Sequence, residues 1–329
     1  MSCRYLSAAD VRQVLTIGAA IEAIEAVMKD AASNAACAPP RTLQVIHRGE
    51  DAADCLFLAM PSTWACRHGA AAKIITYVPD NLEGGRPGVQ GLAVLFDTAS
   101  GSPRLIADAA ALTTIRTGAM VGLATRYLAP TDARVVGIIG TGALAFDLIA
   151  GVAAVRDIER VVVTNRTLQR AEEFVDALPW RAELVRSADS VAAEVEILIT
   201  ATSSLQPVIS RQFIQPGTHI NAVGNFSPGG RELDGPTVAA CDCYVDDLEG
   251  ALVEAGELIL AAEEGLIPSG KDSVVGDLPA LVSGRLPGRT SSEQLTLFKS
   301  VGTALADIAA LTVVADIAEA QERGILLEP

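Results

Sequence analysis

Apolar residues recur every three or four positions in three long stretches of the chain, which is the spacing of an amphipathic helix. The first stretch covers residues 5–33, and its Ser7 and Asp10 form the S-x-x-D pattern of a helix start. The other two stretches cover residues 109–128 and 295–324. We therefore predict helices at the beginning of the chain, a third of the way along it, and at its end.

Between the first two helical stretches the pattern changes to short runs rich in β-branched and aromatic residues. Glycine, proline and acidic residues separate these runs, as in a sheet with tight turns. The predicted strands cover residues 42–47, 55–60, 72–78 and 91–97. Their short connections favour a mostly antiparallel sheet.

From Pro130 onward, strand-like runs alternate with helical stretches. The predicted strands cover residues 134–139, 160–164, 182–186, 196–201, 219–223 and 243–245. Such alternation is typical of a doubly wound parallel sheet. The last helix has the length to leave this sheet and pack back on the first part of the chain. We therefore predict an α/β fold with two regions.

The sharpest motif follows the first strand of the second region. It is a G-x-G-x-x-A sequence made of Gly140, Thr141, Gly142, Ala143, Leu144 and Ala145. Gly140 permits a tight turn, Gly142 lets the backbone approach a pyrophosphate, and Ala145 allows close packing of helix on strand. The helix N-terminus then faces the anion. We predict a dinucleotide-binding turn; the alternative is a glycine-rich turn that binds no ligand.

The end of the next strand distinguishes between two dinucleotides. An NAD(H) site usually has Asp or Glu there, which binds the ribose 2′-hydroxyl. This chain has Asn165, Arg166 and Thr167 instead. Arg166 can pair with a 2′-phosphate and stack on adenine, and the Thr167 hydroxyl can add a hydrogen bond. The pattern favours NADP(H) over NAD(H), unless Arg166 is only a solvated residue at a helix start.

Composition narrows the classes of partner. The 329 residues suffice for roughly two domains. A net charge of −15 argues against nucleic acid or an anionic membrane as a partner, because both bind clustered positive charge. We predict no targeting or membrane-spanning segment and, with six cysteines in so long a chain, no disulfide framework, so we expect a cytoplasmic protein. We expect no metal site, because neither the histidines nor Cys241 and Cys243 have a second ligand pair at suitable spacing.

Three cationic residues lie in apolar or tight segments outside the nucleotide-binding region. Arg41 follows two prolines, Lys73 lies among alanines and isoleucines, and Arg116 lies within the middle helix. Buried cations need an anionic partner. A carboxylate-bearing substrate would serve all three, whereas internal salt bridges would explain each one separately.

An ordered set of motifs runs through the chain. It consists of Pro40-Arg41, Lys73 with Pro79-Asp80-Asn81, residues 111–119, Gly140-Thr141-Gly142-Ala143, Asn221-Ala222-Val223-Gly224, Arg231-Glu232-Leu233-Asp234 and residues 296–302. Over nearly the whole chain this set resembles the ornithine cyclodeaminase/mu-crystallin family. The resemblance implies a homodimer and a Rossmann doubly wound parallel sheet inserted into a mostly antiparallel α+β domain. It places the substrate-binding and dimerisation domain at residues 1–125 plus 303–329, and the NAD(P)-binding Rossmann domain at residues 126–302.

The resemblance also implies roles for individual residues. It places a carboxylate clamp on Arg41, Lys73 and Arg116, the cations already singled out. Thr117 matches a position near the pyrophosphate, and Val223 matches one beside the nicotinamide. Motif and resemblance together predict cofactor binding by Thr117, Gly140, Thr141, Gly142, Ala143, Leu144, Asn165, Arg166, Thr167, Ala201, Thr202, Val223, Gly224, Ser300 and Gly302.

Members of this family move a hydride between nicotinamide and the α-carbon of an amino or imino acid. Two positions in the sequence distinguish its subfamilies. The cyclodeaminases carry a catalytic Glu where this chain has Leu58, and an Asp that acts as general base where it has Phe226. Oxidising a free amine needs a base. Reducing a preformed cyclic imine needs less, because the imine is already protonated near neutral pH, and an apolar Phe226 suits a cyclic aliphatic substrate.

We therefore predict an NAD(P)H-dependent reductase of a small-molecule imino acid, Δ1-pyrroline-2-carboxylate or Δ1-piperideine-2-carboxylate, that forms L-proline or L-pipecolate. Lys73, Arg41 and Arg116 are the predicted catalytic residues. Lys73 is the candidate that polarises or protonates the imine nitrogen, since desolvation lowers the pKa of a lysine. The alternatives are an ornithine or lysine cyclodeaminase, an alanine- or opine-type amino-acid dehydrogenase, and a crystallin-like protein that binds NADPH without turnover.

Overall fold

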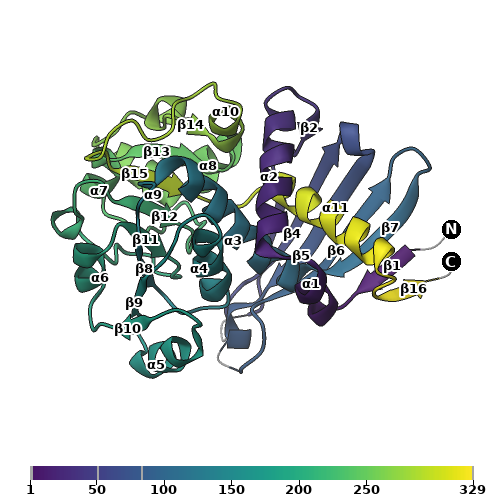
Figure 1. Ribbon diagram of the computed structural model, residues 1–329, viewed down its shortest axis with the longest axis horizontal. Helices are drawn as coiled ribbons and strands as arrows, with labels where there is room; N and C mark the ends of the chain where they lie inside the picture. The colour runs from purple at the N-terminus through teal and green to yellow at the C-terminus, as the bar shows by residue number, and fades with distance from the viewer. Residues whose placement is uncertain (1–2, 50–51, 83, 328–329) are drawn as a thin grey trace. The chain divides into compact units, whose positions relative to one another are not determined.

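A computed structural model describes residues 3–49, 52–82 and 84–327. The chain divides into two compact units, whose elements are labelled in Figure 1. The first unit takes in Met1–Arg116 and Thr303–Pro329, and the second takes in Thr117–Gly302. Helix α3 (Ala109–Leu128) runs from one unit into the other. The predicted domain boundary at residue 125 lies in the same helix as the division between the two units. The boundary at residue 125 itself stays a prediction.

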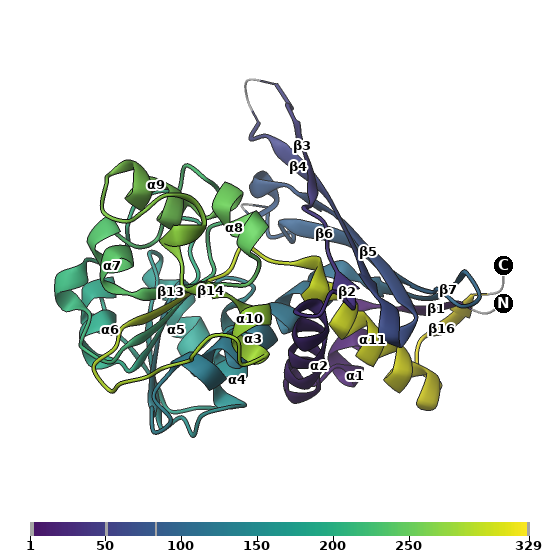
Figure 2. The same ribbon diagram turned by 90° about the horizontal axis from the view of Figure 1, so that it is seen from above.

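The first unit contains a sheet in the order β16-β1-β7-β6-β5-β4-β2, in which β3 also pairs with β4. Its strands are β1 (Cys3–Leu6), β2 (Ala36–Cys37), β3 (Thr42–Ile46), β4 (Cys55–Trp64), β5 (Gly69–Tyr77), β6 (Val89–Asp97), β7 (Ser102–Asp108) and β16 (Ile325–Leu327). All neighbours are antiparallel except β1 and β7, so the predicted mostly antiparallel sheet is confirmed. Figure 2 shows β3 alongside β4, away from the helices of this unit.

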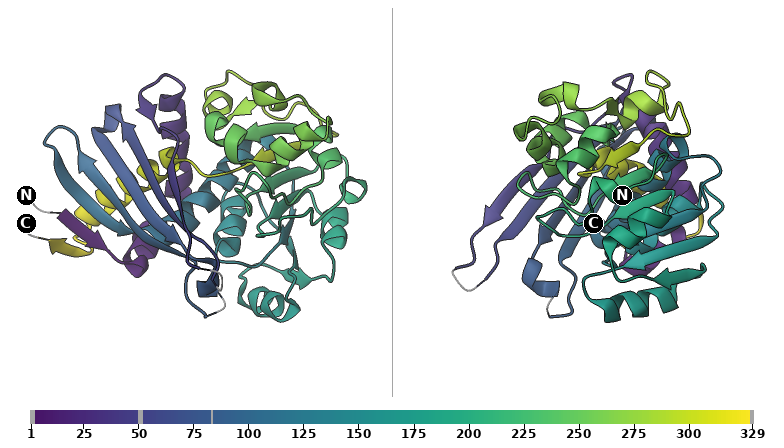
Figure 3. Two further views of the ribbon diagram at one scale, coloured as in Figure 1. Left: turned by 180° about the vertical axis from the view of Figure 1, so that it is seen from behind. Right: turned by 90° about the vertical axis from the view of Figure 1, so that its left-hand side faces the viewer.

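Helices cover one face of this sheet. Lys73 and Ile75 of β5 are buried, whereas Ile74 between them is 44% exposed, because successive side chains point to opposite faces. The covered face packs against α11 (Ala304–Ala320), which crosses β4 to β7 (Figure 3). Helix α2 (Ile17–Ala31) packs along α11, and α1 (Ala8–Val14) contacts β7 and α11. Lys73 therefore points toward the helices.

The N-terminal helical stretch has the predicted cap at Ser7 and is interrupted once. The Ser7 hydroxyl accepts the Asp10 N–H, and the Asp10 carboxylate accepts the Ser7 N–H, so the predicted capping pattern is confirmed. Helix α1 ends at Val14, and Thr16 caps α2 as a separate helix. Tyr5 and Leu6, predicted as helix, belong to β1 instead, because this strand pairs with β7 and β16.

The second unit contains a parallel sheet in the order β10-β9-β8-β11-β12-β15-β13-β14. Its strands are β8 (Val135–Ile139), β9 (Arg160–Thr164), β10 (Ala182–Leu184), β11 (Ile197–Thr200), β12 (His219–Ala222), β13 (Asp242–Val245), β14 (Gly276–Asp277) and β15 (Thr296–Lys299). Every neighbouring pair is parallel, so the predicted doubly wound sheet is confirmed. The strand order reverses between β8 and β11, the place where such sheets bind ligands.

Strand β15 corrects the prediction of a helix from residue 295. It lies between β12 and β13 and is buried along its whole length. A short apolar run buried on both faces fits helical spacing and strand equally well, so its periodicity could not decide between them. The helix of this stretch, α11, begins only at Ala304.

The helices of the second unit lie between its strands in the chain. They are α4 (Ala145–Ala153), α5 (Leu168–Ala177), α6 (Ala188–Glu194), α7 (Gly235–Ala240), α8 (Leu248–Glu254), α9 (Gly256–Glu263) and α10 (Leu278–Val282). Short 3-10 turns occur at η1 (Ala65–Arg67), η2 (Pro79–Leu82), η3 (Arg211–Phe213) and η4 (Gly270–Ser273). Within the part of the chain that the structure describes, no helix has the length and apolar character needed to cross a membrane.

Candidate active site

The glycine-rich turn after β8 has the geometry that its sequence predicts. Gly140 has φ of +103°, and a Cβ there would lie 2.5 Å from the carbonyl oxygen of Ala201, so only glycine fits without strain. Gly142 is exposed, with open space where a Cβ would project. The Thr141 hydroxyl oxygen is buried and has no hydrogen-bond partner among the described residues. An open backbone at a strand-to-helix turn fits the pyrophosphate of a dinucleotide.

The residues after this turn lead into a close contact between α3 and α4. Ala143 is exposed, and Leu144 occupies the N-cap position of α4. A Cβ on Gly118 of α3 would lie 2.1 Å from the carbonyl oxygen of Asp147 in the first turn of α4. Thr117, buried beside Gly118, therefore lies near the start of α4, the helix that follows the turn.

The end of β9 carries the residues predicted to select the dinucleotide. Asn165 is half-buried, and its side-chain amide donates to the Thr167 carbonyl at 3.1 Å. Arg166 and Thr167 are exposed, and Thr167 begins α5 without a capping hydrogen bond from its hydroxyl. The guanidinium and the hydroxyl are therefore accessible to a phosphate group at this strand end.

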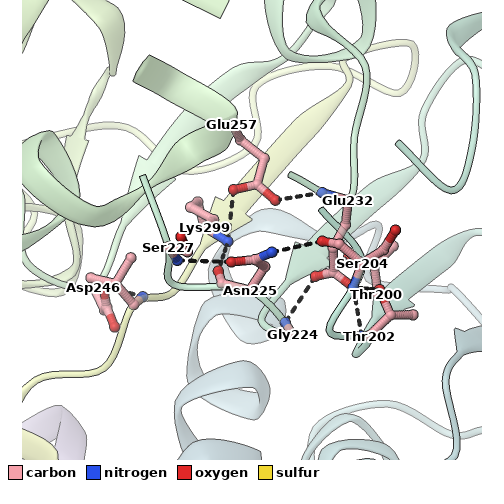
Figure 4. A network of polar contacts seen from close by, with 11 residues as sticks. Thr200, Thr202, Ser204, Gly224, Asn225, Ser227, Glu232, Asp246, Glu257 and Lys299 are labelled. Atoms are coloured by element: carbon pink, nitrogen blue, oxygen red, sulfur yellow. Dashed lines mark hydrogen bonds and ion pairs between the residues drawn. The ribbon is translucent and has the colours of Figure 1, made fainter. Parts of the chain in front are cut away.

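The ends of β11 and β12 lie directly against each other. Ala201 and Thr202 follow β11, and Val223 and Gly224 follow β12. A Cβ on Gly224 would lie 2.1 Å from the backbone nitrogen of Thr202, so this approach requires glycine. Figure 4 shows the buried carboxylate of Glu232 bridging the two strand ends.

The segment after β15 is held by a buried carboxylate. The Ser300 hydroxyl donates to Asp246 at 2.7 Å, and the Gly302 N–H donates to it at 2.6 Å. Asp246 follows β13 and is fully buried. The Ser300 hydroxyl thus has a partner within the protein, and the predicted cofactor contacts of Ser300 and Gly302 stay predictions.

Two of the three cations predicted to be catalytic, Lys73 and Arg116, contact one acidic residue, Asp307, in the first unit. The Lys73 Nζ lies 3.0 and 2.9 Å from the two carboxylate oxygens of Asp307, and the Arg116 Nε lies 3.0 Å from one of them. These three side chains are buried. The structure thus shows the internal salt bridges that the sequence left open for Lys73 and Arg116. Two cations nevertheless share one carboxylate, with the charge of Arg41 near Lys73, and this surplus of positive charge suits an anionic ligand.

The protonation of Lys73 reflects this environment. Burial, followed by the charge of Arg116, lowers the pKa of Lys73 to about 8. Asp307 opposes this shift, and Arg41 adds to it, which places the charge of Arg41 near Lys73 as well. A lysine with a pKa near neutrality can both bind an anion and exchange a proton.

The family model of the ornithine cyclodeaminase/mu-crystallin family matches residues 3–322. The chain belongs to this family. Among its relatives, the Δ1-pyrroline-2-carboxylate reductase of Bacillus cereus is 34% identical over 308 residues, which cover 92% of this chain and 93% of the relative.

Solved structures of ornithine cyclodeaminase/mu-crystallin enzymes share the fold. The Δ1-pyrroline-2-carboxylate reductase of Thermococcus litoralis, in complex with NADH and L-proline, has a TM-score of 0.93 and 32% identity, covering 98% of this chain and 99% of its own. An archaeal alanine dehydrogenase dimer with bound NAD has a TM-score of 0.90 and 30% identity, covering 100% of this chain and 99% of its own. The predicted family and the predicted α/β fold are thereby confirmed.

Two positions at which the sequence departs from the family's cyclodeaminases have apolar surroundings. Leu58 is buried in β4 opposite Ile75, two residues from Met60, the partner of Lys73. Phe226 is half-buried and packs against the apolar core of the second unit. The apolar character of Phe226 is thus explained by this packing alone, without a ligand.

Two acidic residues of the site escaped the sequence analysis. Asp307 lies 234 residues from Lys73 in the chain, and its only signal was an acidic side chain in the apolar first half of a helix. Glu232 was noticed only as part of a motif, in which Asp234 caps α7 by accepting the Thr237 N–H. Among the residues that the structure describes, no three His, Cys, Asp or Glu side chains form a group that could hold a metal ion.

Proposed function

We propose that this chain is an NAD(P)H-dependent reductase that converts Δ1-pyrroline-2-carboxylate or Δ1-piperideine-2-carboxylate to L-proline or L-pipecolate. The observation that carries the proposal is the buried cluster of Lys73, Arg116 and Asp307, with the charge of Arg41 nearby. Its excess of positive charge suits the carboxylate of an imino acid. The likeness to the reductases of Bacillus cereus and Thermococcus litoralis supports the same substrate class.

Each residue of the cluster has a part in this reaction. Arg41 and Arg116 bind the substrate carboxylate and so orient the imine. A bound nicotinamide dinucleotide supplies the hydride that the imine carbon accepts. The Lys73 Nζ polarises the imine nitrogen, or donates the one proton that a neutral imine needs, and Asp307 holds both Lys73 and Arg116 in place.

The cofactor preference is proposed from this chain's own residues. Asn165 and Arg166 at the end of β9 favour NADP(H), because an arginine and a neutral amide accept a 2′-phosphate that an acidic residue would repel. The two solved relatives named above were described with NADH and with NAD, so they support a nicotinamide cofactor and not this preference.

The proposal also assigns a role to each domain and a homodimeric state to the protein. Residues 1–125 plus 303–329 bind substrate and a second copy of the chain, and residues 126–302 bind the dinucleotide. A homodimer agrees with the dimeric state of the archaeal alanine dehydrogenase. The cytoplasmic location that the cysteines suggest stays a prediction.

The proposal is tested by mixing the purified protein with Δ1-pyrroline-2-carboxylate and either NADPH or NADH and following cofactor oxidation by absorbance. We expect rapid oxidation with NADPH preferred. Arg166→Ala should raise the KM for NADPH and leave that for NADH nearly unchanged, whereas the control Arg170→Ala, exposed on the helix α5 that follows Arg166, should change neither. Inertness toward the imine together with oxidation of L-alanine or L-ornithine would replace the reductase by an amino-acid dehydrogenase or a cyclodeaminase.

A further inference from the structure

Glu232 accepts hydrogen bonds from two different strand ends of the second unit. Its Oε1 accepts the Thr202 N–H at 2.6 Å and the Thr202 hydroxyl at 2.8 Å. Its Oε2 accepts the Gly224 N–H at 2.8 Å and the Thr200 hydroxyl at 3.0 Å. Thr200 is the last residue of β11, Thr202 follows that strand, and Gly224 follows β12. One buried carboxylate therefore ties the two strand ends together (Figure 4).

The backbone of Glu232 is held in turn by a buried pair of opposite charges, Glu257 and Lys299. The Glu232 N–H donates to Oε1 of Glu257 at 3.0 Å, and Oε2 of Glu257 lies 2.8 Å from the Lys299 Nζ. The same Nζ donates to the carbonyl of Asn225, the residue after Gly224. Glu232, Glu257 and Lys299 are all completely buried. Removing water from these groups leaves each with only its protein partners, so the positions of the partners are tightly constrained.

We propose that Glu232 is a positioning residue for the nicotinamide half of the cofactor, which it serves by fixing the ends of β11 and β12; this rests on the proposed function. The motif and the resemblance predict that Thr202 and Gly224 bind the cofactor, and Val223 beside them matches a position at the nicotinamide. The adenosine half is predicted elsewhere, at the ends of β8 and β9.

Only a carboxylate can make these four contacts. Each Glu232 oxygen accepts one backbone N–H, from Thr202 on one side and from Gly224 on the other. A glutamine has the same shape but only one oxygen, so its NH2 group would face one of these N–H donors. One strand end would then have to move away, because two donors cannot share a hydrogen bond.

A matched control lies at the opposite edge of the same sheet. The Glu196 carboxylate accepts the backbone N–H groups of Arg134 at 2.8 Å and Val135 at 2.9 Å, so it ties the starts of β8 and β11 together. It also joins two strands, but through its Oε2 alone, which a glutamine can replace with its own oxygen, and at the amino ends of the strands, where parallel sheets do not bind ligands.

The test compares the binding of NADPH with that of 2′-phospho-ADP-ribose, which has no nicotinamide, by calorimetry. Glu232→Gln should weaken NADPH binding roughly tenfold or more, the size of a lost hydrogen bond to a charged group, and leave 2′-phospho-ADP-ribose binding unchanged. It should also lower kcat with little change in the KM for the imino acid. Glu196→Gln should change neither affinity, and thermal melts show whether each variant is folded.

Other results would overturn the proposal. Equal weakening of both ligands by Glu232→Gln would mean a general loss of structure, and unchanged NADPH binding would mean that Glu232 positions nothing. A wild-type protein that binds neither ligand would instead refute the proposed function. Should Glu232→Gln fail to fold, Thr200→Val removes one of the four donors at constant shape and should give a milder loss of NADPH affinity in the same direction.

Discussion

Lys73 is a lysine whose burial brings its pKa down to about 8. Its pKa in the folded chain is about 8, below the ordinary value of 10.5, and burial is the largest cause. Between these two values the unfolded chain binds more protons than the folded chain. The free energy of unfolding should therefore rise as the pH increases from about 8 toward 10.5. Below this window the folded protein keeps a desolvated cation, which it can use to bind an anion.

We predict that the affinity for a carboxylate ligand falls as the pH rises through about 8, because Lys73 then loses its charge. Cyclopentanecarboxylate is a suitable probe, since it has no nitrogen and stays ionised above about pH 6. Calorimetric titrations across this range should show the decrease for the wild type. Lys73→Met should bind the probe weakly at every pH, and it should reduce imine turnover by about 100-fold or more. A flat pH profile in the wild type would remove Lys73 from the clamp.

The sequence reveals the cations of this cluster more readily than their anion. Arg41, Lys73 and Arg116 stand out because each interrupts an apolar or tight segment. Asp307 does not, since an acidic residue in the first turn of a helix is favourable without any partner. Only the fold, which packs α11 on β5, brings Asp307 to Lys73.

At the scale of elements, the turn between β8 and α4 contains two glycines, and a different physical reason explains the need for glycine at each position. Gly140 has a positive φ and no room for a Cβ, whereas Gly142 has open space around it. We predict that Gly140→Ala lowers the stability of the fold by about 1–3 kcal/mol through backbone strain. Gly142→Ala should leave the melting temperature unchanged and weaken NADPH binding by about tenfold, equivalent to ~1.4 kcal/mol, because its methyl group occupies the approach to the pyrophosphate.

The two glycine variants serve as controls for each other, with melting temperature and NADPH affinity measured for both. If Gly142→Ala bound NADPH as the wild type does, the open space at Gly142 would not be a pyrophosphate site. If Gly140→Ala were as stable as the wild type, the strain at Gly140 would be too small to explain the glycine there.

The parallel strands are the elements that the sequence predicts best. Each is an apolar run between helices, and the six predicted strands agree with β8 to β13 within two residues at each end. The sequence predicts least well the strands whose pairing partners are distant in the chain. β1 and β16 pair with each other across nearly the whole sequence, and β15 lies between two strands that precede it, so no local pattern specifies their partners.

At the scale of the whole molecule, the exposed face of the first unit's sheet carries large apolar side chains. Ile74 and Leu92, directly opposite each other on β5 and β6, are 44% and 50% exposed, and Phe96 is 37% exposed. The residues of β4, β5 and β6 that share this face carry no charge: Phe57, Ala59, Pro61, Thr63, Ala70, Ala72, Ile74, Thr76, Gln90, Leu92, Val94 and Phe96. An uncharged apolar face of this kind is typical of an interaction surface.

The proposed homodimer needs an interface, and this uncharged face is our candidate for it. Each copy carries a net charge of −15, so two copies repel each other, and this repulsion is weakest where the contact surface has no acidic groups. We predict a dimer whose mass, measured by light scattering after size exclusion, falls to that of a monomer in Leu92→Asp, because the carboxylate would be buried without a partner. Val253→Asp is the matched control: Val253 is 68% exposed on α8 of the second unit, and this variant should stay dimeric. A wild-type monomer, or a Leu92→Asp variant that remains dimeric, would show that this face does not join two copies.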